Sequence, residues 1–356
     1  MKISDIDKNF NINTKIPEDI SWFDCETEPF KIYGIMREGN QFRRMPQNIA
    51  DTVNKKVMYL NLHTAGGRVR FKTDSTKIAI LANMPSVSKM SHFPFVGSCG
   101  FDLYEEREDD TVYLGSYNPP MDIEKGFSSI LSVGTEKKMR SFTINFPSYS
   151  EVSKLYIGLE ENSEIYEPTP YINTIPVVYY GSSITQGACS SKPGDTYQNF
   201  ISRRFKLDYL NLGFSGSAVA EDSISEYISN LDMSIFVYDY DHNSPNPEHL
   251  AATHEKMFLA IRKKHPNLPI IMLTRPRYER NNDTERRLKV IEQTYNNAIA
   301  RGDNNVYLLK GYEMLAPIKN NGLVDGVHPT SLGFWFMSCA IGNVIEEILK
   351  KGIKLN

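Results

Sequence analysis

The first half of the chain is marked by short runs in which apolar and polar residues alternate. These runs occupy residues 57–62, 68–72, 77–82, 111–114 and 141–146. Side chains that alternate with a period of two point to opposite faces of a β-strand, so one face can be buried. Glycine- and proline-containing turns separate the runs, and no long amphipathic helical pattern interrupts them. The pattern predicts an all-β, jelly-roll-like sandwich.

The second half shows a different pattern, in which apolar runs alternate with longer segments of helical periodicity. The predicted strands are residues 177–180, 209–212, 234–238, 270–274 and 306–309. The predicted helices are residues 196–205, 222–229, 247–264, 284–299 and 331–351. This alternation indicates a parallel sheet with helices on both faces. We therefore expect a flavodoxin-like three-layer α/β/α domain that binds its ligands at the carboxyl edge of the sheet.

The two halves meet in a polar segment that contains Pro168, Pro170 and Pro176. Proline-rich polar segments are typical of domain crossings. A chain of 356 residues is also longer than one hydrophobic core usually serves. We therefore expect two domains, an all-β domain over residues 1–165 and an α/β domain over residues 166–356.

Charge and hydropathy argue against two classes of partner. The formal net charge is −3, and no long block of Lys and Arg is present. Nucleic acid and anionic membrane surfaces are therefore not expected as partners. The chain has no run of about 18 apolar residues, so no membrane span is expected. The oligomeric state does not follow from the sequence.

The amino terminus and the cysteines bear on location. Residues 1–15 are polar throughout and lack the apolar stretch of a secretory signal. The four cysteines are scattered, at positions 25, 99, 189 and 339, and no CxxC pair occurs. We expect free thiols and a cytoplasmic location.

The first predicted strand of the second half leads directly into Gly181-Ser182-Ser183. Glycine permits a sharp turn, which would present the following serine at the edge of the sheet as a nucleophile. A serine in such a turn is equally typical of a helix cap or a loop. After the second strand, Gly213 and Gly216 would leave backbone N–H groups free to face a developing oxyanion, or would simply allow a turn with positive φ.

The third strand ends in a polar cluster that admits three interpretations. Asp239, Asp241 and His242 could contribute to a metal site, or the aspartates could cap the next helix. Alternatively, the side-chain amide of Asn243 could donate a hydrogen bond to an oxyanion. Its place at the ligand edge favours the Asn243 interpretation, and the metal interpretation lacks an obvious set of further ligands. No metal is therefore expected.

Before the last helix, Asp325 and His328 stand three residues apart in Asp-Gly-Val-His-Pro. In this spacing a carboxylate can accept a hydrogen bond from one imidazole nitrogen, leaving the other to take a proton from serine. Taken alone, the motif could equally be a turn with a helix cap. The order of the four signals, each after a predicted strand, gives them more weight together.

Together these residues resemble the SGNH, or GDSL-type, hydrolase superfamily, whose four sequence blocks carry Ser, Gly, Asn and an Asp-x-x-His pair. The resemblance implies that Ser183 is the nucleophile, His328 the general base and Asp325 its orienting partner. It also implies an oxyanion hole formed by Ser183, Gly216 and Asn243. The first block departs from the common Gly-Asp-Ser form, and its two adjacent serines leave Ser182 as a second candidate. The third block lacks the usual glycine two residues before its asparagine.

The resemblance extends to the first half. Gly100-Phe101-Asp102-Leu103-Tyr104 matches the GxDLY motif of the β-domain found in one branch of this superfamily, and residues 63–74 are also similar to that domain. Nearly the whole chain is thus covered. Asp102 is expected to cap a turn at the contact between the domains, without a catalytic role.

The resemblance implies an ester hydrolase that works through an acyl-enzyme and needs no cofactor. The insertion between Gly187 and Tyr197 is short and polar, which argues against a lipid-binding lid. We therefore expect a small-molecule or oligosaccharide ester as substrate, with acetyl as the acyl group. Arg275, at the end of the fourth strand, could hold the substrate or form an ion pair. An acyltransferase and a carbohydrate-binding protein remain alternatives.

Overall fold

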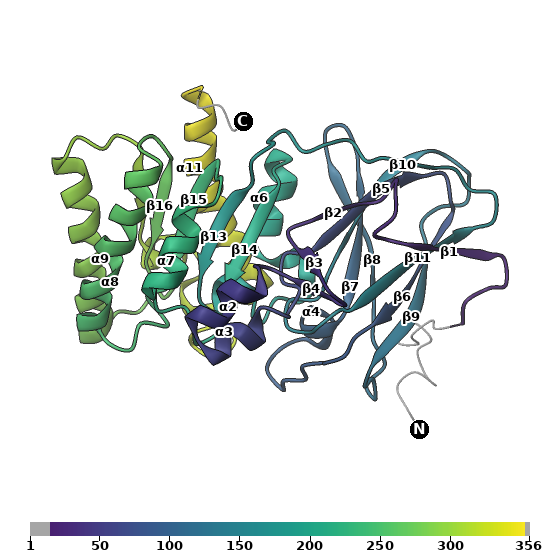
Figure 1. Cartoon of the computed structure of the whole chain (residues 1–356), viewed down its shortest axis with the longest axis horizontal. Helices are drawn as coiled ribbons and strands as arrows, with labels where there is room; N and C mark the ends of the chain where they lie inside the picture. Colours follow the sequence, from purple (N-terminus) through teal and green to yellow (C-terminus); the bar gives the residue numbers. More distant parts are fainter. Residues whose placement is uncertain (1–14, 353–356) are drawn as a thin grey trace.

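Two lobes lie side by side in the computed structural model, which describes residues 15–352 (Figure 1). One lobe is formed by antiparallel strands and the other by a parallel sheet with helices on both faces. Residues 1–14, on which the expectation of a leaderless amino terminus depends, lie outside the described part. All four cysteines lie inside it, and none of them forms a disulfide there.

The first lobe is a sandwich of two antiparallel sheets. In one sheet the order is β1 (Ile20–Asp24), β11 (Lys154–Glu160), β6 (Lys77–Asn83) and β9 (Gly126–Ser132). In the other it is β12 (Ile165–Tyr166), β5 (Arg68–Thr73), β10 (Arg140–Asn145), β7 (Phe101–Glu106) and β8 (Thr111–Tyr117), with β2 (Lys31–Tyr33) also on β5. A hairpin of β3 (Met36–Glu38) and β4 (Gln41–Arg43) and the short helix α4 (Phe95–Cys99) complete the lobe. The predicted β-sandwich is confirmed.

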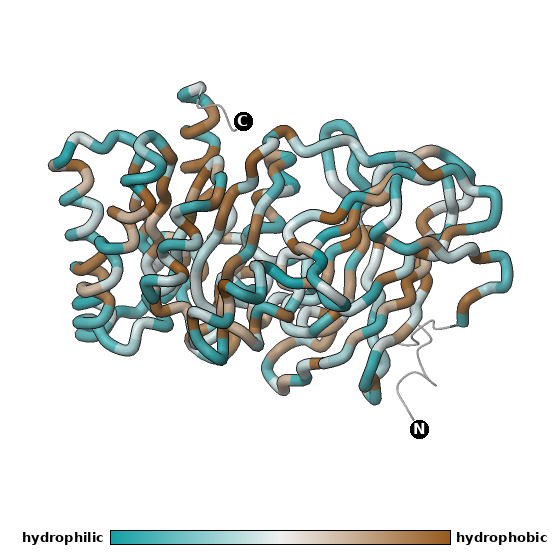
Figure 2. Tube along the Cα trace, viewed as in Figure 1, coloured by the Kyte–Doolittle hydropathy of each residue, from teal (hydrophilic) through white to brown (hydrophobic). Residues whose placement is uncertain are grey.

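Alternate residues of these strands fill the space between the two sheets. Val69 and Phe71 of β5 pack there with Ile78 and Ile80 of β6, and all four side chains are fully buried. Figure 2 shows the apolar positions gathered inside the sandwich and along the parallel sheet, with hydrophilic positions on the outer loops. The period of two seen in the sequence thus reflects one buried face per strand.

The second lobe is built on five parallel strands in the order β14 (Tyr209–Gly213), β13 (Val177–Gly181), β15 (Ile235–Asp239), β16 (Ile270–Leu273) and β17 (Val306–Leu309). Its helices are α5 (Ser183–Gln186), α6 (Tyr197–Phe205), α7 (Asp222–Ser229), α8 (Pro247–Lys264), α9 (Asn282–Ala300), α10 (Gly311–Met314) and α11 (Ser331–Lys350). Two 3₁₀ turns lie at Pro193–Asp195 and Lys319–Gly322. The strand order is that of flavodoxin-like sheets, so the predicted fold class is confirmed.

The two faces of this sheet carry separate hydrophobic cores. On β13, Val178 and Tyr180 face a core closed by α7, α8 and α9. Val177 and Tyr179 of the same strand face the opposite core, which α6 and α11 close. Because both faces are covered, the strands read as continuous apolar runs in the sequence.

Helix α11 is, within the described chain, the one helix long and apolar enough to cross a membrane by length and composition alone. Its buried residues recur at helical spacing, from Phe334 through Met337 and Ile341 to Ile345, and they pack in the core under the sheet. This packing accounts for the apolar composition of the helix.

One predicted strand is wrong. Residues 57–62 were expected to form a strand, but residues 57–60 belong to helix α3 (Lys55–Leu60), which helix α2 (Gln47–Val53) precedes, and residues 61–62 follow its end. The side chain of Asn54 caps α3 by accepting hydrogen bonds from the backbone N–H groups of Lys56 and Val57. Val57 and Leu60, three residues apart, then share one helix face and pack into the core of the second lobe. The first half of the chain thus supplies two helices to the α/β lobe (Figure 1).

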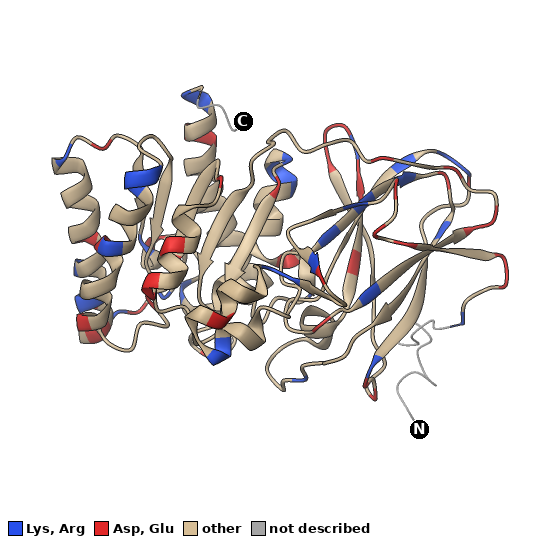
Figure 3. Ribbon diagram, in the orientation of Figure 1, with Lys and Arg blue, Asp and Glu red and all other residues tan. Residues whose placement is uncertain are grey.

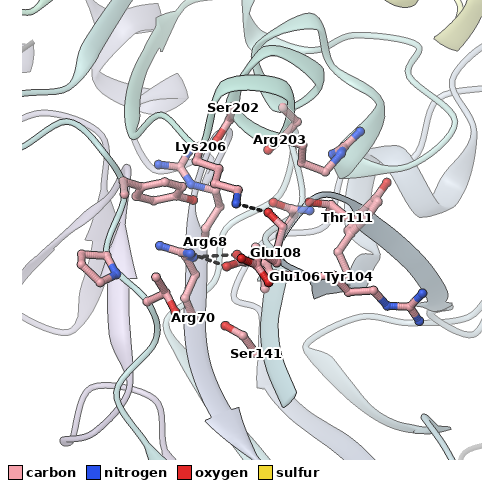
Figure 4. A pocket seen from close by; sticks show the side chains of 17 residues that line it. Arg68, Arg70, Tyr104, Glu106, Glu108, Thr111, Ser141, Ser202, Arg203 and Lys206 are labelled. Carbon is pink, nitrogen blue, oxygen red and sulfur yellow. Dashed lines mark hydrogen bonds and ion pairs between the residues drawn. The ribbon is translucent and has the colours of Figure 1, made fainter. Parts of the chain in front are cut away.

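The contact between the lobes is rich in charge. Arg68 of β5 pairs with Asp208 of the second lobe at 2.5 Å, and Arg70 pairs with Glu106 of β7. Arg68, Arg70 and Glu106 line a cavity of about 360 Å³, which Lys206, at the end of α6, borders from the other lobe (Figure 4). Elsewhere, charged residues of both signs are spread over both lobes (Figure 3).

Candidate active site

The two adjacent serines in the turn after β13 make different contacts. The Ser182 hydroxyl accepts a hydrogen bond from the backbone N–H of Ile184 at 3.2 Å and so caps α5. Ser183 is the first residue of this helix and points its hydroxyl toward His328. A side chain on Gly181 would lie 2.3 Å from the carbonyl oxygen of Asp239, which explains the glycine before the serines. The geometry therefore favours Ser183 over Ser182 as the reactive serine.

Ser183, His328 and Asp325 form one chain of hydrogen bonds. The Ser183 Oγ lies 2.9 Å from His328 Nε2, and His328 Nδ1 lies 2.7 Å from Asp325 Oδ2. The other carboxylate oxygen, Oδ1, accepts the backbone N–H groups of Val327 and His328. Ser183 lies 142 positions before Asp325 in the sequence, whereas Asp325 and His328 belong to one Asp-x-x-His turn. The structure brings all three together at the carboxyl edge of the sheet.

The Asp325 carboxylate is held in its ionised form. Partial burial raises its pKa, but the hydrogen bonds from the His328 backbone and ring and from Val327 outweigh burial and lower the pKa to about 2. An ionised carboxylate at His328 Nδ1 keeps a proton on that nitrogen, which leaves Nε2 free to accept one from Ser183.

Gly216 and Asn243 lie beside this chain on neighbouring loops. Gly216 has a φ of +63°, and no atom lies within 4 Å of the position a Cβ would occupy, so its surroundings are open. The Asn243 side chain donates to the carbonyl oxygen of Phe214 at 2.9 Å. A carboxamide carries two N–H groups, so one remains for a ligand. The Asn243 contact also ties the loop after β15 to the loop that contains Gly216.

Gln186, which was not predicted as a site residue, holds this arrangement in place. Its Oε1 accepts the backbone N–H of Ser215 at 3.0 Å, next to Gly216. Its Nε2 donates to the Ser148 carbonyl at 3.2 Å and lies 3.1 Å from His63 Nδ1. Burial lowers the pKa of His63 to about 3, so the ring is neutral and can accept this hydrogen bond. One buried side chain thus connects the helix of Ser183, the Gly216 loop and the β-domain.

Arg44, from the β-domain, supports the same loop from its other side. Its guanidinium donates to the carbonyl oxygens of Gly213, Asn211 and Leu60 and lies over the ring of Phe214. Burial lowers the pKa of Arg44 to about 9. The sequence carried one usable signal for these contacts, the similarity of residues 63–74 to the GxDLY domain, but it did not indicate which residues reach the loops around Ser183.

Asp241, in the acidic cluster after β15, forms hydrogen bonds and an ion pair with another residue of the protein. Asp241 accepts hydrogen bonds from the Arg275 backbone at 3.0 Å and from its Nε at 2.8 Å. Arg275 Nη1 also lies 3.6 Å from Asp283. Arg275, for which substrate binding and an ion pair were both considered, is thus engaged in an ion pair. Burial lowers the pKa of His242 to about 3, and its Nε2 finds no hydrogen-bond partner within residues 15–352.

The β-domain also forms one wall beside Ser183. The Tyr149 hydroxyl donates to the Ser183 carbonyl at 3.3 Å, and Phe93 packs on the Tyr149 ring. His92, next in the chain, is exposed at the rim, with its Nε2 4.0 Å from Asp325. Asp102 of the GxDLY motif accepts hydrogen bonds from the Gly194 N–H at 2.6 Å and from Asn145, which is the expected turn cap at the domain contact.

Comparison with known proteins assigns both lobes. Residues 174–346 match the GDSL-like lipase/acylhydrolase family, and residues 20–165 match the GxDLY family, the N-terminus of SGNH hydrolase-type esterases. The chain therefore belongs to the SGNH/GDSL-type hydrolases, in the branch with a GxDLY β-domain before the catalytic domain. No curated protein matches the chain in sequence.

Solved structures show the same two-lobed arrangement. A protein described as a GDSL-like lipase from Bacteroides ovatus is 26% identical, with a TM-score of 0.84 over 93% of this chain and 98% of that one. The salicylyl-acyltransferase SsfX3 from a tetracycline biosynthetic pathway is 16% identical, with a TM-score of 0.73 over 94% and 99%. An acetyl xylan esterase from Butyrivibrio proteoclasticus is 11% identical, with a TM-score of 0.59 over 93% and 99%. The last two likenesses concern the fold alone.

Proposed function

We propose that the protein is a serine ester hydrolase that removes a short acyl group, acetyl first of all, from a polar alcohol of the carbohydrate class. The observation that carries the proposal is the hydrogen-bonded chain from Ser183 through His328 to Asp325, at 2.9 and 2.7 Å. These distances suit direct proton transfer from a nucleophile to a general base.

In the first step Ser183 Oγ attacks the ester carbonyl and His328 Nε2 takes its proton. Asp325 stabilises the imidazolium that forms. The negative charge that develops on the carbonyl oxygen is met by the backbone N–H groups of Ser183 and Gly216 and by the free N–H of Asn243. Each such donor is typically worth roughly 3 kcal/mol in the transition state.

In the second step His328 returns its proton to the leaving alcohol oxygen, which departs and leaves an acyl-enzyme on Ser183. Water then attacks the acyl carbonyl while His328 Nε2 accepts the water proton. Collapse of the second tetrahedral intermediate releases the carboxylic acid and returns the proton to Ser183. Apart from the ester and one water molecule, every group in this cycle belongs to the chain.

Two observations support a short acyl group. Residues 187–196, which follow the serine helix, make a tight turn and the 3₁₀ helix Pro193–Asp195 and are largely buried, so they do not form an extended apolar lid. Phe93 and Tyr149 of the β-domain, with Ala188 and Cys189, close one side of the serine. A long acyl chain would need an apolar groove, whereas an acetyl group needs only a small pocket. The fold shared with an acetyl xylan esterase is consistent with a sugar ester.

The test is release of p-nitrophenol from acetyl, butyryl and octanoyl esters by the wild type, Ser183→Ala and Ser182→Ala. We expect preference for the acetyl ester, loss of turnover in folded Ser183→Ala, and retention of turnover in Ser182→Ala, which loses only a helix cap worth about 1 kcal/mol. Full activity in folded Ser183→Ala would refute the proposal.

The same assay separates the alternatives. Products formed with added alcohol acceptors would show whether the acyl group goes to water or to an alcohol, as in an acyltransferase. Absence of turnover, together with no labelling of Ser183 by a serine-directed phosphonate and measurable binding of oligosaccharide, would establish a carbohydrate-binding protein instead.

A further inference from the structure

Three side chains that can bind a metal meet beside the reactive serine. They are His92 from the β-domain, Cys189 from the turn after α5, and His328. One nitrogen or sulfur atom from each lies within 4.8 Å of the other two. His92 Nε2 also lies 4.0 Å from the Asp325 carboxylate, which offers an oxygen to the same space. The group therefore joins both lobes and reaches the centre of the catalytic arrangement.

A thiolate with two imidazoles is a ligand set that Zn²⁺ prefers. Around one tetrahedral zinc ion, ligand nitrogen and sulfur atoms lie about 3.3–3.6 Å apart. Because the three atoms here lie within 4.8 Å of one another, they need to approach by at most about 1.5 Å. His92 can supply this movement, because its side chain is 45% exposed and lies on the loop between β6 and α4. Cys189 and His328 are held by their surroundings and would move less.

We propose that His92, Cys189 and His328 bind Zn²⁺ and that binding switches the enzyme off. This inference depends on the proposed function for its effect on activity, but not for the site itself. On binding, the Cys189 thiol gives its proton to solvent and its sulfur becomes a ligand.

Zinc binding inhibits the enzyme because both ring nitrogens of His328 already have a partner. Nε2 faces Ser183 Oγ and Nδ1 faces Asp325 Oδ2. A metal on Nε2 removes the proton acceptor of Ser183, and a metal on Nδ1 removes the contact that orients the ring. Either mode of binding therefore disables the general base. Chelation of the ion restores both contacts.

A packing role is the alternative explanation for Cys189. The residue is 3% exposed and lies among Phe93, Tyr149 and Ala188, where a small apolar side chain would also fit. Packing does not explain why the exposed His92 lies so close to it. The two explanations differ in what His92→Ala does, because packing of Cys189 does not need an imidazole.

The first experiment titrates Zn²⁺ against hydrolysis of p-nitrophenyl acetate, with Mg²⁺ as the ion that prefers oxygen ligands. We expect inhibition by Zn²⁺, reversal by EDTA, and no inhibition by Mg²⁺. His92→Ala should require roughly 10- to 100-fold more Zn²⁺ to halve its own zinc-free rate, the factor that loss of even a hydrogen-bond partner of a metal ligand typically costs. His265→Ala, at the far end of α8, is the matched control and should behave like the wild type. An unchanged half-inhibition concentration in His92→Ala would overturn the proposal.

A second measurement does not depend on activity. Co²⁺ added to folded Ser183→Ala should give a thiolate-to-cobalt charge-transfer band in the near ultraviolet, and this band should vanish in Ser183→Ala/Cys189→Ser. If the band appears but the wild type hydrolyses no ester, the metal site stands and the proposed function fails. If esters are hydrolysed but no Cys189-dependent band appears, the metal site is refuted and the proposed function stands.

Discussion

Replacing Gln186 by methionine is the most informative perturbation of this protein. Methionine has nearly the same length and volume as glutamine but cannot form hydrogen bonds of comparable strength. The change leaves the backbone N–H of Ser215, the carbonyl of Ser148 and the Nδ1 of His63 without their partner. The methionine side chain fills the space that the glutamine side chain occupied, so the substitution removes hydrogen bonds and leaves no cavity.

The expected effect on stability follows from these three contacts. A buried group that loses its hydrogen-bond partner costs about 1–3 kcal/mol. The variant also no longer buries a polar carboxamide, which offsets part of that cost. We expect the free energy of unfolding to fall by about 2–4 kcal/mol.

The expected effect on activity is separate. Ser215 precedes Gly216, whose N–H is the proposed oxyanion donor, and Gln186 fixes the position of that loop. Removal of one donor typically costs about 10²–10³ in kcat, and a displaced donor retains part of its effect. We expect kcat to fall about 10- to 100-fold with KM within about threefold, because the donor acts mainly in the transition state.

The assay is hydrolysis of p-nitrophenyl acetate at a temperature where urea titration shows the variant to be folded. Gln198→Met is the matched control. Gln198 is equally buried, but its Nε2 donates to the Thr185 carbonyl at 2.7 Å, and within residues 15–352 it forms no hydrogen bond to the Gly216 loop. A Gln186→Met variant that is destabilised but retains the kcat of Gln198→Met would refute the positioning role.

Two further substitutions test the electrostatics. Asp325→Asn should lower kcat by about 10⁴ with little change in KM, since an amide can stabilise the wrong tautomer of His328; a decrease below tenfold would contradict the proton-transfer scheme. Burial, reinforced by the charge of Asp241, raises the pKa of Asp239 from 3.8 to about 8. The folded protein then holds more protons than the unfolded chain between these values, so stability from this group is present below about pH 4 and is lost as the pH rises through about 8. Asp239→Asn should flatten this decline and raise the free energy of unfolding near pH 9 by on the order of 1–3 kcal/mol, as measured by urea titration; a less stable variant at that pH would show that the charge is compensated.

Much of the fold could be predicted because its two halves differ in periodicity. The parallel strands are buried on both faces, and their apolar runs end within one or two residues of the observed bounds, as for β17 at Val306–Leu309. Residues 57–62 were mispredicted because six residues with alternating polarity fit a strand as well as a short helix. The helix is favoured over the strand by the Asn54 cap and by packing against a core that lies in the other lobe. Packing against a distant core cannot be seen in a local sequence pattern.

The candidate site shows the same division. The meeting of Ser183, Asp325 and His328 could be predicted because the proposed chemistry requires particular residue types next to predicted strand ends. Gln186 and Arg44 could not, because their partners are mostly backbone carbonyl and N–H groups, which leave no mark on the sequence. Arg275 lies where it was predicted, yet its guanidinium meets Asp241, since opposite charges at one sheet edge pair with each other.

The seating of α2 and α3 against the sheet of the second lobe has a consequence for biosynthesis. Val57 and Leu60 leave the ribosome more than a hundred residues before the strands of the second lobe, from β13 onward, whose apolar side chains belong to the same core. Until those strands are made, the nascent β-domain must display an apolar surface that normally lies in the interior, and such surfaces attract chaperones and promote aggregation. The sandwich, although it has a complete core of its own, is therefore a finished structure only after the last strands of its neighbour have formed.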